Sequence, residues 1–265
     1  MLPTFVATRI PDFINRFGTM DYSGDFNLNP QKITIDGNAI TALGDADLNV
    51  LLQDYRNNLR YSGTVVADDI NLRQITEVKE LGFIKGKMQF HGVGTNVESL
   101  RLKADGNLVY LDLLDKRYKN VMVDGKLERQ IFSGIVNIRD SNLDAVYNVT
   151  FDFSGNQFKL NFKSNVRRIN LDYLGVTKDL NARLKADIQG DFTFRNLDDF
   201  IGNLDVQNLH FTSKNDTLSL PEAHLISSKT GETQNLMLDV PGYLTGEIHG
   251  KYRLSQLPDA MINAV

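Results

Sequence analysis

A period of two governs the longest patterned runs in this chain. Over residues 184–194, apolar or small side chains occupy the even positions and polar side chains occupy the odd ones. Successive side chains on a β-strand point to opposite faces, so such a run predicts a strand with one apolar and one polar face. The same alternation returns, between turn-forming residues, over 20–28, 84–90, 100–110, 121–127, 147–153 and 244–254. The sequence therefore predicts an all-β fold of long antiparallel strands.

Helical signal is limited to short segments. Residues 10–17, 196–202 and 257–265 each fit one or two helical turns and lie beside predicted strands. We therefore expect short helical connectors between long strands, with no separate helical domain.

The chain also repeats itself. Residues 184–201 and 244–261 align without a gap and are identical at five positions: Leu184/Leu244, Ile188/Ile248, Gly190/Gly250, Leu197/Leu257 and Asp199/Asp259. A weaker echo places Ile-Asn-Leu at 70–72 and again at 169–171, with a leucine at 81 and at 180. A restated strand-plus-helix unit is typical of an extended array. Because no linker composition interrupts it, residues 1–265 are interpreted as one continuous repeat array.

Glycines recur within the predicted strands, on the apolar face. They are Gly24, Gly86, Gly106, Gly190, Gly246 and Gly250. Glycine inside a strand marks a bulge, a bend or a close approach of another backbone. Local bulges and a systematic curl of the sheet toward that face are both compatible with the pattern.

Composition and motifs argue against several classes of function. The chain has 29 Lys and Arg against 33 Asp and Glu, a net charge of -4 and no basic block, so no nucleic-acid partner is expected. It has no cysteine, and its four histidines lack metal-ligand spacing. No apolar run reaches the roughly 18 residues of a membrane-spanning helix. We expect no catalytic residue, no metal site and no cofactor, and hence no enzyme.

Three stretches resemble the repeated units of TamB-like proteins of the Bacteroidota, within the AsmA-like superfamily. They read YKNVMVDGKLERQIFSGIVNIRDSNLDAVYNVTFDFSG at 118–155, YSGTVVADDINL at 61–72 and VRRINLDYLGVTKDLNARLKADIQGDF at 166–192. The resemblance spans residues 18–254 and consists of alternation, glycines and Asn-Leu turns. It implies strands curled into an open half-pipe, the β-taco, with an apolar groove inside.

The resemblance also implies a place and a role. Members of this family are anchored in the inner membrane, cross the periplasm and are implicated in moving phospholipids to the outer membrane. With an outer-membrane TamA-type barrel protein they are also implicated in assembling β-barrel proteins. The chain would be an interior periplasmic fragment, with the membrane anchor and the region that binds the TamA-type protein outside it.

Three hypotheses remain open at this stage. The first is a conduit in which phospholipid acyl chains lie along a groove formed by the apolar parity of the clearest strands. The expected lining residues are Leu184, Ile188, Phe192, Phe194, Leu244, Ile248, Tyr252, Leu254, Leu100, Leu102, Leu108 and Met88. The second is a scaffold whose strand edges template barrel strands, or pair edge-to-edge with another copy. The third is a closed β-barrel or sandwich that binds a small hydrophobic ligand.

Overall fold

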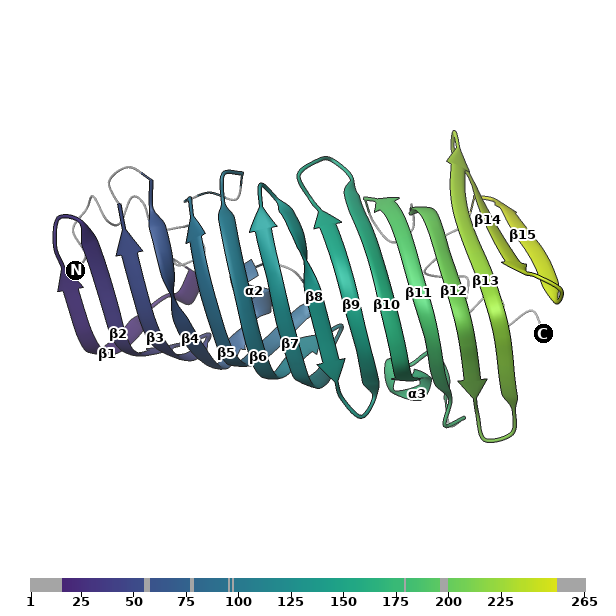
Figure 1. Ribbon diagram of the computed structural model, residues 1–265, viewed down its shortest axis with the longest axis horizontal. Coiled ribbons are helices and arrows are strands. Elements are labelled where there is room, and N and C mark those ends of the chain that lie inside the picture. Colours follow the sequence, from purple (N-terminus) through teal and green to yellow (C-terminus); the bar gives the residue numbers. More distant parts are fainter. Residues whose placement is uncertain are drawn as a thin grey trace. The chain divides into compact units, whose positions relative to one another are not determined.

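The computed structural model describes residues 16–54, 58–76, 79–94, 96, 98–178, 180–195 and 200–251. The described residues form long antiparallel strands and two short helices, and the strand order follows the chain order (Figure 1). The strands are β1 (Met20–Leu28), β2 (Lys32–Thr41), β3 (Gly44–Gln53), β4 (Arg60–Asn71), β5 (Leu81–Val93), β6 (Arg101–Leu113), β7 (Lys116–Glu128), β8 (Ile131–Arg139), β9 (Leu143–Asp152), β10 (Phe158–Asn170), β11 (Arg183–Phe194), β12 (Ile201–Thr212), β13 (Thr217–Thr230), β14 (Thr233–Val240) and β15 (Leu244–Gly250), and the helices are α2 (Leu72–Thr76) and α3 (Leu171–Leu174).

The chain divides into two compact units, Met1–Ser141 and Asn142–Val265. The first unit contains β1 to β8, and the second contains β9 to β15. Within the described part of each unit, every strand pairs only with its neighbours in chain order, so the first strand does not pair with the last. The fold is therefore the predicted one, an open, curled all-β sheet with short helices, and the strands do not close into a barrel.

The strand registers keep the apolar side chains of each unit on one face. In the second unit, Ile188 of β11 lies opposite Ser164 of β10 and Val206 of β12. In the first unit, Met88 of β5 lies opposite Val65 of β4 and Gly106 of β6. Because directly opposed residues share a face, these pairings define an apolar face and a polar face in each unit.

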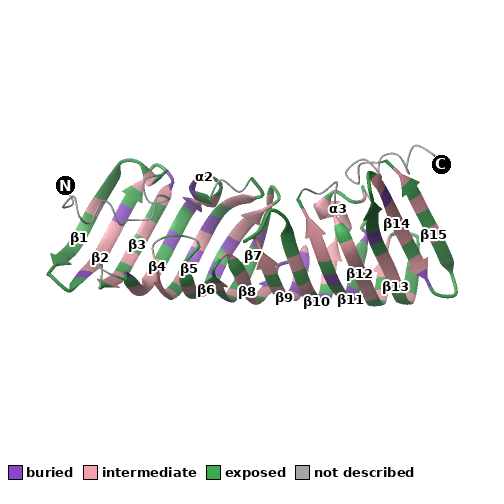
Figure 2. Ribbon diagram, turned by 90° about the horizontal axis from the view of Figure 1, so that it is seen from above, coloured by how far each residue is buried: buried purple, intermediate pink, exposed green. Residues whose placement is uncertain are grey.

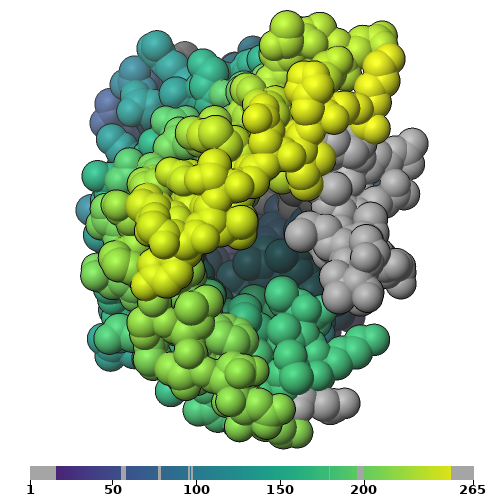
Figure 3. Space-filling view, turned by 90° about the vertical axis from the view of Figure 1, so that its right-hand side faces the viewer, coloured from purple at the N-terminus to yellow at the C-terminus, as the bar shows by residue number. Residues whose placement is uncertain are grey.

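The apolar face of neither unit is a sealed core. Fully buried side chains such as Ile33, Val121 and Val166 are at most 1% exposed, but most of their neighbours on the same face keep part of their surface accessible. Figure 2 shows the buried residues as isolated bands along the strands. Figure 3 looks onto the second unit from the β15 end, where its green and yellow strands curve around a hollow.

Both helices begin at the Ile-Asn-Leu echo found in the sequence. The side chain of Asn71 accepts a hydrogen bond from the backbone N–H of Gln74 at 3.2 Å, and that of Asn170 accepts one from Tyr173 at 3.2 Å. The asparagine backbone N–H groups donate to the carbonyls of Leu43 at 2.7 Å and of Asn142 at 2.8 Å, respectively. Each pair of equivalent residues is 99 positions apart. The weaker echo therefore marks a structural repeat: the end of β4 with α2 and the end of β10 with α3 are built in the same way.

The predicted helices fall elsewhere. The helix expected over 196–202 is wrong at its C-terminal end, because Ile201 and Gly202 belong to β12, where they pair with β11. Residues 196–199, and most or all of the helices expected over 10–17 and 257–265, lie outside the described residues. Five helical residues in α2 and four in α3 are too few to show a helical period, which is why the sequence did not reveal them.

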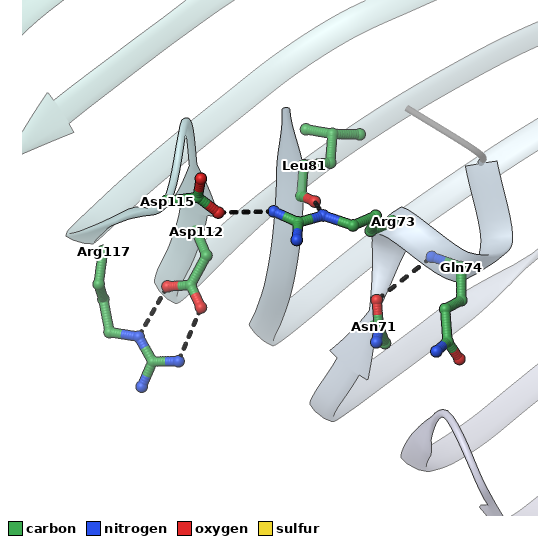
Figure 4. A network of polar contacts seen from close by, with 7 residues as sticks. All are labelled: Asn71, Arg73, Gln74, Leu81, Asp112, Asp115 and Arg117. Atoms are coloured by element: carbon green, nitrogen blue, oxygen red, sulfur yellow. Dashed lines mark hydrogen bonds and ion pairs between the residues drawn. The ribbon is translucent and has the colours of Figure 1, made fainter. Parts of the chain in front are cut away.

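A polar network anchors α2 beside the turn between β6 and β7 (Figure 4). The guanidinium of Arg73 donates to the carbonyl of Leu81 at 3.0 Å and to Asp115 at 2.7 Å. In the same figure Arg117 donates two hydrogen bonds to Asp112, at 2.7 and 2.8 Å. Exposed ion pairs contribute only ~0.2–1 kcal/mol each, so the network positions the helix more than it stabilises the unit.

Candidate functional site

Glycines and aromatic rings together shape the apolar faces. A Cβ at Gly92 would lie 2.7 Å from the ring of Tyr61, and one at Gly190 would lie 2.5 Å from the ring of Phe162. In both cases the ring belongs to the residue directly opposite on the next strand. The missing side chain lets the ring lie across the glycine. The result is a low apolar surface where ordinary side chains would stand up.

The glycines within the strands differ in whether they mark a local bulge or lie in a regular strand. At Gly86 the register shifts, so this glycine lies at a bulge. At Gly24, Gly106 and Gly190 the registers run on without a shift. There the glycine accommodates close backbone or ring approach in a regular strand. At Gly24 a Cβ would lie 2.3 Å from the carbonyl oxygen of Asp36 on β2.

In the second unit, the described members of the predicted lining lie on one face. The β11 members are joined through β12, β13 and β14 to the β15 members by registers such as Val206 with Ala223 and Leu236 with Ile248. All of them are half-buried except Leu244, which is more exposed, at 57%. The residues placed there are Leu184, Ile188, Phe192, Phe194, Leu244 and Ile248. Tyr252 and Leu254 lie outside the described residues.

In the first unit, Met88, Leu102 and Leu108 lie on one face of β5 and β6. Leu108 is only 5% exposed, so it contributes to local packing more than to an accessible surface. Leu100 precedes β6, which begins at Arg101, and its backbone is held in a turn through a 2.9 Å hydrogen bond to the Asn96 carbonyl. The alternation therefore extended the strand one residue too far at this end.

The predicted lining contained Phe194 but omitted the other members of its phenylalanine cluster in the second unit. Phe151 lies 5.7 Å from both Phe153 and Phe158, ring centre to ring centre, and 6.5 Å from Phe194. Phe192 joins a second group, 5.3 Å from Phe200. The alternation already placed residues 151 and 153 on an apolar face. What the sequence does not reveal is that the turn between β9 and β10 brings them against Phe158.

Leu204, Val206 and Leu209 of β12 were also omitted, although all three pair with apolar residues of β13. The reason is a break in the period of two. Asn208 has a φ of 53°, and the register with β11 shifts beside it. The apolar positions therefore change from even to odd within one strand, which hides them from a search for strict alternation.

The polar faces are held by hydrogen bonds between side chains. Asp187 accepts one from the amide of Asn208 at 2.9 Å and one from Asn165 at 2.7 Å, and these bonds hold the pKa of Asp187 below its ordinary value. His224 lies 2.7 Å from the carboxylate of Asp205, and that hydrogen bond raises the pKa of the imidazole. These contacts order the polar side chains along the face of the second unit.

Within the part of the chain described, no three His, Cys, Asp or Glu side chains are grouped as metal ligands. None of the described helices is both long and apolar enough to span a bilayer. No family model matches the chain, and comparisons with curated proteins and with solved structures return no match. The half-exposed apolar face is the candidate functional site of each unit.

Proposed function

We propose that the chain is part of a periplasmic conduit for phospholipids between the inner and outer membranes. The observation that carries this proposal is the half-exposed apolar face of each unit, lined by residues such as Ile188 and Met88 and backed by a polar face. Contiguous exposed apolar surface is limited on soluble monomers, and a larger expanse of it marks a site that binds a partner, a ligand or lipid. Acyl chains would cover it.

The energetics of lipid transfer require nothing beyond such a surface. Each CH₂ group removed from water contributes about 0.8 kcal/mol, so a sixteen-carbon chain that leaves a bilayer unaided loses on the order of 12 kcal/mol. An apolar face that accompanies the chain removes most of this barrier without a catalytic group. The apolar surface at Gly92 and Gly190 suits an acyl chain, because there an aromatic ring lies across the glycine and the glycine itself adds no side chain beside it.

The deciding experiment compares two adjacent residues on β11. A photocrosslinking side chain at Ile188, on the apolar face, is expected to capture lipid, whereas one at Asp187, on the polar face, is not. Ile188→Asp is expected to abolish lipid transfer and to leave the circular dichroism spectrum unchanged, because Ile188 is only partly buried. Equal capture at both positions contradicts the proposal.

A scaffold for outer-membrane barrel strands is the second candidate. It is favoured by the outer edges of β1 and β15, with which no described strand pairs. Unpaired edges can add a strand from another chain, from a barrel precursor or from a second copy of this protein. Crosslinks from β15 to barrel precursors, with no lipid on the apolar faces, would favour this function.

A further inference from the structure

An open depression of about 640 Å³ lies on the first unit, at one end of β4 to β7. Two rows of cross-strand neighbours line it. One polar-face row carries Arg60 and Arg101. The second polar-face row, two residues farther along the strands, carries His91, Lys103 and Lys126. All five side chains belong to the polar face. Residues of the apolar-face row between them, Tyr61, Gly92, Leu102 and Leu127, also line the depression.

The depression is rich in positive charge, although the chain as a whole has a net charge of -4. Arg101 is paired with Glu128 at 3.1 Å, and Arg60 with Asp54 at 3.6 Å. Lys103 lies directly opposite Lys126. Among the described residues, no carboxylate lies within 4.0 Å of either ammonium group.

Like charges directly opposite on neighbouring strands destabilise a sheet. Asp105 and Asp124 stand opposite each other one row farther along the same strands and only partly offset the lysines. Facing Cα atoms on paired strands are about 5 Å apart, so a tetrahedral oxyanion between the two ammonium groups can accept from both. An anion bound there would turn an unfavourable pair into a site.

We propose that this depression binds a phosphate group, and that the phosphate is the headgroup phosphodiester of a lipid whose acyl chains lie on the apolar face of the same unit. Arg60 and Arg101 are the first residues of β4 and β6, and His91, Lys103 and Lys126 lie two residues from the ends of their strands, so all the basic side chains stand near the edge where these strands end. Tyr61 and Leu102 are the next residues and belong to the apolar face. A lipid at this rim presents its tail to one face and its phosphate to the other.

The proposal deepens the proposed function and rests on it for the source of the phosphate, but the anion site itself does not depend on it. The test variant is Lys103→Gln with Lys126→Gln in the full chain. The matched control is Lys159→Gln with Lys163→Gln, which removes two exposed charges from the polar face of β10 in the second unit. Both variants change the net charge by the same amount.

The first measurement is the amount of lipid retained per chain, by mass spectrometry, after incubation with phosphatidylglycerol vesicles or with diacylglycerol in uncharged micelles. Because exposed charge pairs each contribute little, losing two lysines should reduce phosphatidylglycerol retention about tenfold. Diacylglycerol retention should stay unchanged, and the control should retain both lipids like the wild type. Equal phosphatidylglycerol retention in all three proteins overturns the lipid assignment.

The second measurement is a titration of the lipid-free chain with inorganic phosphate, followed by the backbone amide signals of residues 91, 103 and 126. A saturable shift in the wild type that is lost in the Lys103/Lys126 variant establishes the anion site. No shift overturns the site altogether. If the wild type retains neither lipid, the conduit function fails while the titration still decides the site. A shift without headgroup-dependent lipid retention assigns the site to free phosphate.

Discussion

The backbone at Gly202 admits no other residue. Its φ is 149°, and a Cβ there would lie 1.9 Å from the carbonyl oxygen of Asp191 on the paired strand. Gly202→Ala should therefore displace β12 from β11 and lower the free energy of unfolding by about 1–3 kcal/mol, as overpacking of a close contact does. Urea unfolding followed by circular dichroism measures this loss.

Gly246 provides the matched control, because it also lies on the apolar face of a strand in the second unit. Nothing lies within 4 Å of a Cβ built there. Gly246→Ala should be neutral or stabilise the chain by about 0.5–1 kcal/mol, since alanine costs less backbone entropy in a strand. Equal destabilisation by both changes would show that close backbone approach does not determine which glycines the sheet requires.

Asp187 makes stability depend on pH in a defined direction. Its pKa in the folded chain is lowered from 3.8 by the hydrogen bonds from Asn208 and Asn165. The ionised form therefore stabilises the fold above the ordinary pKa, and that contribution is lost as the pH falls through the lowered value. Asp187→Asn should cost a few tenths to about 1 kcal/mol at pH 7 and progressively less in acid.

Urea unfolding of Asp187→Asn at pH 7 and at pH values below 3.8 checks this. Asp191→Asn on the same face of β11 is the comparison, because Asp191 accepts a single amide bond, from Asn161 at 3.2 Å, and should cost less at pH 7. A difference between the wild type and Asp187→Asn that grows as the pH falls would contradict the expected sign.

At the scale of the element, the caps of the short helices can be tested directly. Asn170 satisfies the N–H of Tyr173 at the start of α3, and helix caps of this kind contribute about 1 kcal/mol. Asn170→Ala should lower the free energy of unfolding by at least that amount, whereas Asn170→Asp, which keeps the accepting oxygen and loses only the hydrogen bond from the Asn170 amide to the Asn142 side chain at 3.0 Å, should cost less. If alanine and aspartate cost the same, the cap is not what orders the turn between β10 and β11.

Alternation predicts an element's faces only while its backbone stays regular. Within residues 184–194 the apolar side chains occupy the even positions from end to end. Both faces of β11 could therefore be predicted from sequence. The apolar face of β12 was not predicted, because the left-handed conformation of Asn208 moves the apolar side chains from even to odd positions. The basic depression on the first unit was not predicted from the sequence for a different reason. That Lys103 faces Lys126 is a matter of register, and pairing partners are not written in either strand alone.

At the scale of the whole molecule, each strand makes its extensive contacts with its neighbours in chain order within its own unit, as between β6 and β7 or between β10 and β11. Stability in such an array is close to a sum of local terms. Gly37→Ala, whose Cβ would lie 2.4 Å from the carbonyl oxygen of Ser23, should therefore raise hydrogen exchange in β1 to β3. Protection in β11 to β13 should be unchanged.

Hydrogen exchange read by mass spectrometry reports both regions in one experiment. Loss of protection across all strands to the same degree would mean that the sheet opens as a single cooperative body. The repeat over 184–201 and 244–261 supports the local expectation only in part. Its strand halves are β11 and β15, and residues 196–199 and 252–261 of its remainder lie outside the described residues.

The agreement of strand order with chain order has an evolutionary corollary. Tandem duplication or loss of an even number of strands leaves the direction of every later strand as it was, so the gene can gain or lose modules without rewiring the pairing. An odd number would oblige one antiparallel neighbour to become parallel. The 99-residue module from Leu72 to Asn170 comprises six strands, β5 to β10. At about 4.8 Å per strand, six strands paired side by side occupy roughly 29 Å, so the number of copies would set how far such strands extend.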